Sequence, residues 1–332
     1  MKRYLDAVAL FFYLLTIRIG SFTMNIPSFF LLLENMMSLS HLSLVLLVMA
    51  IWGFSFVVIS LGLAEISPLM LCLVRFFFTC FPAIFFVARP LAPFRLVMMY
   101  GLVVMALQFS LLFIGMKTGM TAGLASLVMQ VQVFFTMILA VLFLNEKINV
   151  WQVLGALVAF FGLGIIGFNM GVQGSLLGFL LVFIAAGMWG YGNMLTKKLG
   201  SINMLSLVVW GSLFAWPPML LMVVYVEGAQ SIIVATQHLS WTLVGAIVYM
   251  VLPNTLFGFS VWSWLLSRHP IITIAPFTLL VPVAGMLSAV WILNEPLQTW
   301  KMWAAAFIVL GLCIHLWAPS KNKICYDLES KG

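Results

Sequence analysis

Long runs of apolar residues, separated by short polar or turn-forming segments, fill this chain from residue 41 to residue 318. A helix that crosses the hydrocarbon core of a membrane needs about 20 such residues. Ten runs have roughly that length, at 42–63, 67–88, 94–116, 121–143, 150–168, 175–197, 203–226, 240–266, 271–293 and 299–318. The breaks carry turn residues or charge, as at Arg268-His269-Pro270. The pattern predicts an all-α membrane protein with ten transmembrane helices.

The second half of the chain repeats part of the first. Residues 137–165 correspond to residues 286–314 at a constant offset of 149 positions, without a gap. Each copy contains an apolar run, a break at an Asn-Glu pair, and a second apolar run; the two glutamates are Glu146 and Glu295. Internal repeats in membrane proteins are typical of transporters whose halves face each other across a pathway. The repeat therefore indicates transport.

Positive charges predict the orientation of the helices, because cytoplasmic loops carry an excess of Lys and Arg. If the first helix begins in the cytoplasm, only Lys117 and Lys301 fall outside. The positive residues that fall inside are Arg89, Arg95, Lys147, Lys197, Lys198, Arg268, Lys321, Lys323 and Lys331. We therefore expect both ends of the ten-helix core, and the tail at 319–332, to be cytoplasmic.

Five helices precede the second half, so we expect that half to enter the membrane inverted relative to the first. The earlier parts of the halves also correspond, since Trp52-Gly53-Phe54 resembles Trp189-Gly190-Tyr191. The break at Glu146 then lies on the cytoplasmic side and the break at Glu295 on the outer side. We expect both to act as helix junctions or gates. Two inverted five-helix repeats are typical of a secondary transporter in which one half rocks against the other.

Residues 1–40 do not fit into the two repeats, which we place at 41–169 and 174–318. This apolar extension is interrupted by charge and glycine and lacks a convincing signal-peptide cleavage site. Three alternatives remain for it. Translation begins at Met36 or Met37, the extension adds an eleventh membrane segment, or it forms an interfacial helix.

Composition places the protein in lipid. Hydrophobic residues make up 64% of the chain and charged residues 7%, whereas a soluble domain carries about 25% charged residues. The net charge of +7 is spread over short loops and forms no basic face for nucleic acid. Cys72, Cys80 and Cys313 lie in apolar runs without metal-ligand spacing, so we expect packing residues, with no metal and no cofactor.

Arg75 is the only charged residue well inside a predicted helix. An arginine at the bilayer centre costs at least about 2.5–3.5 kcal/mol on insertion scales, so protein or water must surround it. Two interpretations are open. Arg75 holds a substrate carboxylate, or it bonds helix-end carbonyls and neighbouring amides and only positions helices.

Amide and aromatic side chains at membrane depth complete the candidate site. Gln130 and Gln132 are about 200° apart around a helix, so we expect that both cannot face the same way. Trp189 and Asn193 share one face of the sixth helix, and Asn254 follows a proline that frees a backbone carbonyl. The candidate substrate-binding residues are Arg75, Gln108, Gln130, Gln132, Asn193, Asn254, Trp52, Trp189 and Tyr249. The alternatives are hydrogen bonds between helices for the amides and interfacial anchoring for the tryptophans.

Small residues predict a close helix contact. Gly155 and Gly162 are seven residues apart and are matched in the second half by Ala304 and Gly311. That spacing allows helices to approach closely, so we interpret these residues as helix-packing positions and not as ligand contacts.

The ninth run contains Pro276 and Pro282, which predict a bent or discontinuous helix. No Asp or Glu lies in the middle of any run. A proton-coupled carrier often uses such a carboxylate as a relay. Proton coupling is therefore unsupported, and the default role of Glu146 and Glu295 is to cap the next helix.

Specific stretches resemble a known family. They are Phe81-Pro82-Ala83-Ile84-Phe85-Phe86-Val87-Ala88-Arg89-Pro90, Ala122-Gly123-Leu124-Ala125-Ser126-Leu127-Val128-Met129-Gln130-Val131-Gln132, Trp52-Gly53-Phe54 and Arg75-Phe76. With them the chain, over roughly residues 38–318, resembles the EamA family of the drug/metabolite transporter superfamily, and most closely its exporters of O-acetylserine and cysteine. The resemblance implies ten helices in two EamA repeats, an inner-membrane location and export of small amino-acid metabolites.

The first hypothesis is therefore an exporter of cysteine, O-acetylserine or related solutes, whose partners are a small-molecule substrate and the lipid bilayer. A second is a carrier for another small solute, including an importer or a drug exporter. A membrane enzyme is disfavoured, because HExxH is absent and no pair of carboxylates lies at shared depth within the runs. A scaffold is disfavoured because it does not need two inverted halves.

Overall fold

The computed structural model describes residues 17–19, 22–24, 38–169, 175–200, 202–237, 239–295 and 298–317. Within these ranges the chain is helical except for loops and one antiparallel pair of short strands, β1 (Ile17–Ile19) and β2 (Phe22–Met24). The predicted helical class is confirmed. The alternatives for residues 1–40 and the position of the tail at 319–332 fall largely outside the described residues.

The helices fall into two sets, and η marks their 3-10 and π segments. The first set is α3 (Leu39–Glu65), α4 (Pro68–Cys80), η1 (Ala83–Phe85), α5 (Phe94–Tyr100), η2 (Gly101–Leu107), α6 (Gln108–Lys117), α7 (Ala122–Val128), η3 (Met129–Val131), α8 (Gln132–Leu144) and α9 (Val150–Asn169). The second set is α10 (Leu176–Leu199), α11 (Met204–Met222), η5 (Val223–Glu227), α12 (Gln230–Gln237), α13 (Trp241–Tyr249), η6 (Met250–Phe259), α14 (Ser260–Arg268), α15 (Ile271–Ile274), η7 (Ala275–Leu280), α16 (Val281–Leu293) and α17 (Thr299–Trp317).

Eight helical stretches of the described residues are long and apolar enough to cross a membrane. They are Leu39–Glu65, Pro68–Phe85, Phe94–Lys117, Ala122–Leu144, Leu176–Leu199, Met204–Glu227, Trp241–Arg268 and Ala275–Leu293. The other two predicted runs fall on α9 and α17, which contain the shorter apolar helices Val150–Gly162 and Thr299–His315. The protein is thus a multi-pass membrane protein. The short helix α12 lies in a segment for which the apolar pattern predicts only a loop.

Local sequence explains where the helices begin and end. Five N-cap side chains accept a hydrogen bond from the backbone amide three residues on; they are Ser38, Thr121, Ser175, Asn203 and Ser240. The two Asn-Glu breaks end α8 and α16 in the same way, because Asn145 and Asn294 adopt the left-handed conformation at φ 55° and 53°. Asparagine tolerates that conformation better than other residues with a side chain.

Several helices change pitch near their middle. The segments η2 and η6 are π-helical, and η3 and η7 are 3-10. Pro253 lies inside η6, Pro276 is the second residue of η7, and Pro282 is the second residue of α16, so the predicted break in the ninth run is confirmed. Irregular backbone at membrane depth is tolerated where it is buried in protein or lines a cavity.

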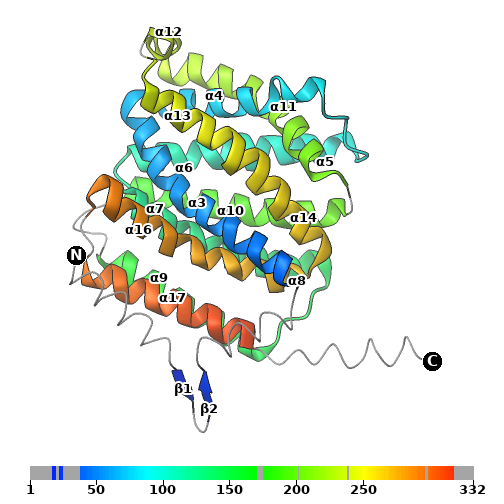
Figure 1. Ribbon diagram of the computed structural model, residues 1–332, viewed down its shortest axis with the longest axis vertical. Coiled ribbons are helices and arrows are strands. Elements are labelled where there is room, and N and C mark those ends of the chain that lie inside the picture. The colour runs from blue at the N-terminus through cyan, green and yellow to red at the C-terminus, as the bar shows by residue number, and fades with distance from the viewer. Residues whose placement is uncertain are drawn as a thin grey trace.

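The two sets pack in a reciprocal arrangement. In Figure 1, α9 and α17 lie side by side at one end of the molecule, and α4 and α11 lie together at the opposite end. Between them, α3 packs on α16 and α10 packs on α8. A Cβ atom on Gly53 would come within 2.4–2.8 Å of Ala284 and Gly285. A Cβ atom on Gly190 would come within 2.8–3.2 Å of Phe135 and Thr136. These two residues lie 149 positions before Ala284 and Gly285, so the two contacts correspond.

Candidate substrate cavity

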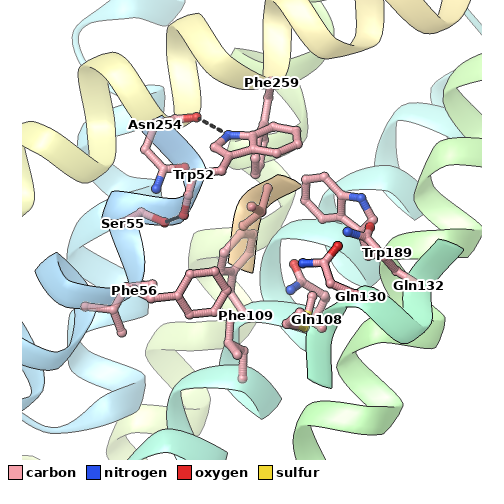
Figure 2. Close-up of a pocket in the computed structure, with 14 residues that line it drawn as sticks. Trp52, Ser55, Phe56, Gln108, Phe109, Gln130, Gln132, Trp189, Asn254 and Phe259 are labelled. Atoms are coloured by element: carbon pink, nitrogen blue, oxygen red, sulfur yellow. Dashed lines mark hydrogen bonds between the residues drawn. The ribbon is translucent and has the colours of Figure 1, made fainter. Parts of the chain in front are cut away.

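A cavity of about 450 Å³, which includes its space open to solvent, lies where α3, α6, η3 and the start of α8 meet α10, η6 and the start of α16. Its lining comes from both sets of helices and contains no charged side chain; it consists of Trp52, Ser55, Phe56, Ile59, Gln108, Phe109, Leu112, Met129, Gln130, Gln132, Trp189, Asn254, Phe259 and Val281. Figure 2 shows these residues around the cavity.

Aromatic rings form one wall. The ring centroids of Trp52 and Trp189 are 5.1 Å apart in an edge-to-face arrangement, and Phe259 contacts both indoles. Such pairs contribute about 0.5–1.5 kcal/mol beyond their buried area. The indole Nε1 of Trp52 donates to the backbone oxygen of Asn254 at 3.3 Å. The predicted tryptophans therefore line the cavity as a fixed pair, one from each repeat.

Three glutamine amides and one indole supply the polar groups on one side of the cavity. The side-chain oxygens of Gln108, Gln130 and Gln132 are buried without a hydrogen-bond partner, and so is Trp189 Nε1. A buried amide oxygen without a partner costs about 1–3 kcal/mol. Figure 2 places these four residues on one side, and Asn254, Ser55 and Trp52 on the other. The unpartnered groups are thus concentrated on one side of the cavity.

The expectation that Gln130 and Gln132 cannot face the same way was wrong, since both line the cavity. It assumed a continuous α-helix with about 100° per residue. The helix instead breaks into the 3-10 segment η3 between α7 and α8. The amide nitrogen of Gln130 donates to the backbone oxygen of Ser126 at 2.9 Å, which holds the side chain in place.

Arg75 is fully buried but does not line the cavity. Its Nε donates to Thr255 Oγ1 at 2.9 Å and its Nη2 donates to Asn254 Oδ1 at 3.3 Å. The guanidinium also lies 4.0 Å from the ring centroid of Phe109, which does line the cavity. Arg75 therefore lies directly behind the cavity wall, and Asn254 separates it from the interior.

Two other candidates lie away from the lining. Asn193 donates to Thr136 Oγ1 at 3.1 Å and accepts from Trp262 Nε1 at 2.9 Å, so its amide joins three helices. The hydroxyl of Tyr249 donates to the backbone oxygen of Ile51 at 2.9 Å. Both make the interhelical hydrogen bonds that are typical of polar residues in membrane bundles.

The four glutamates of the described residues each connect one set of helices to the start of a helix in the other. Glu146 Oε1 accepts from the amide of Ile271, the first residue of α15, at 3.0 Å. Its counterpart Glu295 lies beside the start of α7, since its Oε2 would be 3.0 Å from a Cβ atom on Gly123. Glu295 also forms an ion pair with Lys301 at 3.8 Å.

The remaining two glutamates make similar contacts. Glu227 accepts from the amides of Leu69 and Met70 at the start of α4, at 2.9 and 3.2 Å. Glu65 accepts from the hydroxyl of Ser240, the N-cap of α13, at 2.6 Å. Negative charge is favourable at a helix N-terminus. Three of these carboxylates therefore accept hydrogen bonds across the two sets of helices, and Glu295 lies beside the other set.

A histidine pair also joins the two sets. His41 Nδ1 lies 2.9 Å from His269 Nε2, and Lys197 Nζ donates to the backbone oxygen of His269 at 2.6 Å. Burial, followed by the positive charges of His41, Lys197 and Arg268, lowers the pKa of His269 from its ordinary 6.5. The surroundings of His269 therefore disfavour the protonated form of its imidazole.

Sequence reasoning missed the role of three aromatic or hydroxyl side chains, Ser55, Phe109 and Phe259, which line the cavity. It also missed Thr255, which accepts from Arg75. In a chain with 29 phenylalanines, an apolar ring in an apolar run carries no signal of its own. The spacing Trp52 to Ser55 to Phe56 along one helix face is the only local hint.

Comparisons with known proteins agree with this architecture. The model of the EamA-like transporter family matches residues 39–168 and again residues 176–317. A protein of Escherichia coli strain K12 named "Probable amino-acid metabolite efflux pump" is 38% identical over 280 residues, which cover 82% of this chain and 93% of that protein. A protein of the same name from Salmonella typhimurium strain LT2 is 39% identical over 279 residues, with the same coverage.

A solved crystal structure shares the fold, with a TM-score of 0.63 and 16% sequence identity over 87% of this chain and 99% of that one. The two matches of the family model each cover one set of helices, and together they take up most of the chain. The chain belongs to the EamA-like transporter family, within the drug/metabolite transporter superfamily.

Proposed function

We propose that this protein is an inner-membrane secondary transporter that exports small amino-acid metabolites, such as cysteine and O-acetylserine, by alternating access. The observation that carries the proposal is the uncharged cavity between the two sets of helices, with four polar atoms that lack protein partners. The names of two relatives, which cover most of this chain, support an amino-acid metabolite as cargo.

The proposed architecture is ten transmembrane helices in two inverted repeats, at 41–169 and 174–318. Reciprocal contacts support it, because a two-fold axis makes each contact occur twice with the partners exchanged. The contact of Gly53 with Ala284 recurs as the contact of Gly190 with Phe135. The excess of Lys and Arg in one set of loops supports cytoplasmic ends for this core.

The proposed binding mode matches a zwitterion. The glutamine oxygens accept hydrogen bonds from the ammonium group, and the indoles of Trp52 and Trp189 enclose the side chain. A cavity without a charged side chain favours a solute of zero net charge, since an unpaired ion in a low-dielectric site is costly. In this binding mode Asn193 and Tyr249 do not contact the solute. Their hydrogen bonds hold in place the helices that carry the lining residues.

The proposed gates are the helix junctions at Glu146 and Glu295. Each carboxylate crosses to the start of a helix in the other repeat, so rocking of the repeats must release one of them. In the inverted topology the Glu146 contact is cytoplasmic and the Glu295 contact is external. The two junctions are therefore suited to closing opposite ends of the pathway.

The alternative is a carrier for another small solute, including an importer, because the gradient sets the direction of a reversible carrier. The absence of a carboxylate from the cavity lining disfavours a pump for cationic drugs, for which a counter-charge is expected.

Metabolite profiling of the medium, from cells that lack the protein and from cells that overproduce it, tests the proposal. We expect cysteine-pathway compounds to rise in the medium on overproduction and to fall on deletion. Efflux from proteoliposomes loaded with L-cysteine or O-acetylserine then isolates the carrier. If L-cysteine and O-acetylserine leave no faster than from protein-free liposomes, while an unrelated solute is transported, the first hypothesis is contradicted and a carrier for another solute is favoured.

A further inference from the structure

We infer that Arg75 is a positioning residue that makes the Asn254 side of the cavity selective for the carboxylate of the solute. The inference rests on the proposed function, since it assigns a role to one side of the same cavity. It replaces direct contact between Arg75 and the solute with an effect transmitted through Asn254.

The orientation of the Asn254 amide follows from its partner. A guanidinium can only donate hydrogen bonds, so the atom of Asn254 that faces Arg75 at 3.3 Å is the carbonyl oxygen. The backbone oxygen of Asn254 is occupied by Trp52 Nε1. The side-chain NH₂ is left to face away from Arg75, and Asn254 lines the cavity. Arg75 thereby turns Asn254 into a hydrogen-bond donor toward the solute.

The support for Arg75 is itself fixed. Thr255 accepts from Arg75 Nε and donates to the backbone oxygen of Met250 at 2.6 Å, which settles the direction of its hydroxyl. That bond spans five residues within η6, where the wider π-helix around Pro253 exposes backbone oxygens. The guanidinium carbon also lies 4.0 Å from the ring centroid of Phe109. These contacts with Thr255, Asn254 and Phe109 fix the position of the Arg75 guanidinium.

The positive charge of Arg75 makes the Asn254 side of the cavity selective for a carboxylate. Arg75 is 0% exposed. Among the described residues, the ion pair at 4.0 Å or less joins Glu295 and Lys301, and no carboxylate lies within that distance of Arg75. Its Nη1 also lacks a hydrogen-bond partner. A buried cation without a counter-charge creates a positive potential in its surroundings, and low dielectric strengthens it. The Asn254 side therefore attracts negative charge, while the acceptor-rich glutamine side suits the ammonium group.

The Asn254→Asp variant tests this without removing Arg75. The new carboxylate keeps the shape of the side chain and pairs with Arg75, but it removes the donor and cancels the positive potential. The ligands are L-cysteine and L-cysteine methyl ester, which lacks the carboxylate, under the same reducing conditions. The readout is the ligand-induced rise in the melting temperature of the purified protein, titrated to give each Kd.

We expect wild-type protein to prefer L-cysteine over its methyl ester by about 10- to 100-fold, the contribution of one hydrogen bond to a charged group. Asn254→Asp should abolish or reverse that preference. The matched control is Asn193→Asp, which puts the same charge on a buried amide that lies off the lining and should keep the preference. Arg75→Gln should reduce it, with Arg75→Lys, which keeps the charge, between the two.

Equal affinity of wild-type protein for both ligands, or an unchanged preference in Asn254→Asp, overturns the inference and leaves the carrier proposal standing. Binding of neither ligand by wild-type protein overturns both, because it removes the amino-acid cargo itself. A preference lost equally in Asn254→Asp and Asn193→Asp assigns the effect to buried charge in general and also overturns the inference.

Discussion

Gly155 of α9 and Gly311 of α17 are in backbone contact, because a Cβ atom on Gly155 would lie 2.5 Å from the backbone oxygen of Gly311. The reciprocal Cβ atom on Gly311 would lie 2.4 Å from the backbone oxygen of Gly155. Seven residues further along α9, a Cβ atom on Gly162 would lie 2.7 Å from the backbone oxygen of Ala304. The residue numbers run in opposite directions, so the two helices are antiparallel. The predicted helix-packing role of these glycines is confirmed.

Replacement of Gly155 by leucine should therefore destabilise the protein strongly. The obstacle is backbone, which cannot rotate away, so we expect a cost at or above the upper end of the range of about 1–3 kcal/mol for overpacking. The measurement is the melting temperature in detergent. The control is Gly164→Leu on the same helix, where a Cβ atom meets nothing within 4 Å. Equal melting temperatures for the two variants would contradict the close contact.

Replacement of Gln108 by leucine should separate binding from stability. The side-chain oxygen of Gln108 has no protein partner, so its removal should leave the melting temperature unchanged or raise it. Affinity for the solute should fall about ten-fold, the value of one hydrogen bond. The control is Asn193→Leu, which breaks two interhelical bonds and should lower the melting temperature. A Gln108→Leu protein with normal transport would remove this residue from the site.

The variants Glu146→Gln and Glu295→Gln should bias the transporter in opposite directions. Each loses the charge that favours a helix N-terminus, worth about 0.3–1 kcal/mol at exposed sites. Under the proposed topology, Glu146→Gln should expose the cavity to the cytoplasm and Glu295→Gln should expose it to the outside. Labelling of a Ser55→Cys cavity reporter by membrane-impermeant thiol reagents, applied to vesicles of each orientation, measures this. Shifts toward the same side in both variants would argue against paired gates.

Acid should weaken the contact between His41 and His269. The pKa of His269 is below its ordinary 6.5 in the folded protein, because burial and then the charges of His41, Lys197 and Arg268 disfavour the imidazolium. The neutral form is therefore favoured on folding. Stability from this group is complete above about pH 6.5 and is lost as the pH falls from there through the lowered pKa.

Melting temperatures measured between pH 7.5 and pH 5 test this expectation. The His269→Gln variant should lose less stability over that interval than wild-type protein. Parallel curves for wild-type and His269→Gln would show that the pair does not sense acid.

The helical architecture is largely readable from the chain, because each membrane helix must satisfy its own backbone hydrogen bonds within one continuous apolar run. Ten apolar runs, the repeat offset of 149 residues and the twin Asn-Glu breaks are local or periodic features. The polar residues of the site were also recognisable as a set, since lipid penalises each of them wherever it lies. Trp52, Trp189, Asn254 and the three glutamines all line the cavity.

What each polar residue does depends on contacts between distant segments. Arg75 and Asn254 are separated by 179 positions, and their bond places the guanidinium behind the cavity wall. Gln130 and Gln132 both line one cavity across the 3-10 segment η3, whereas the period of a regular α-helix would place them about 200° apart. An apolar run specifies that a segment is buried in lipid or protein, but not which neighbour it meets. The division between lining and supporting residues therefore arises only when the two repeats pack together.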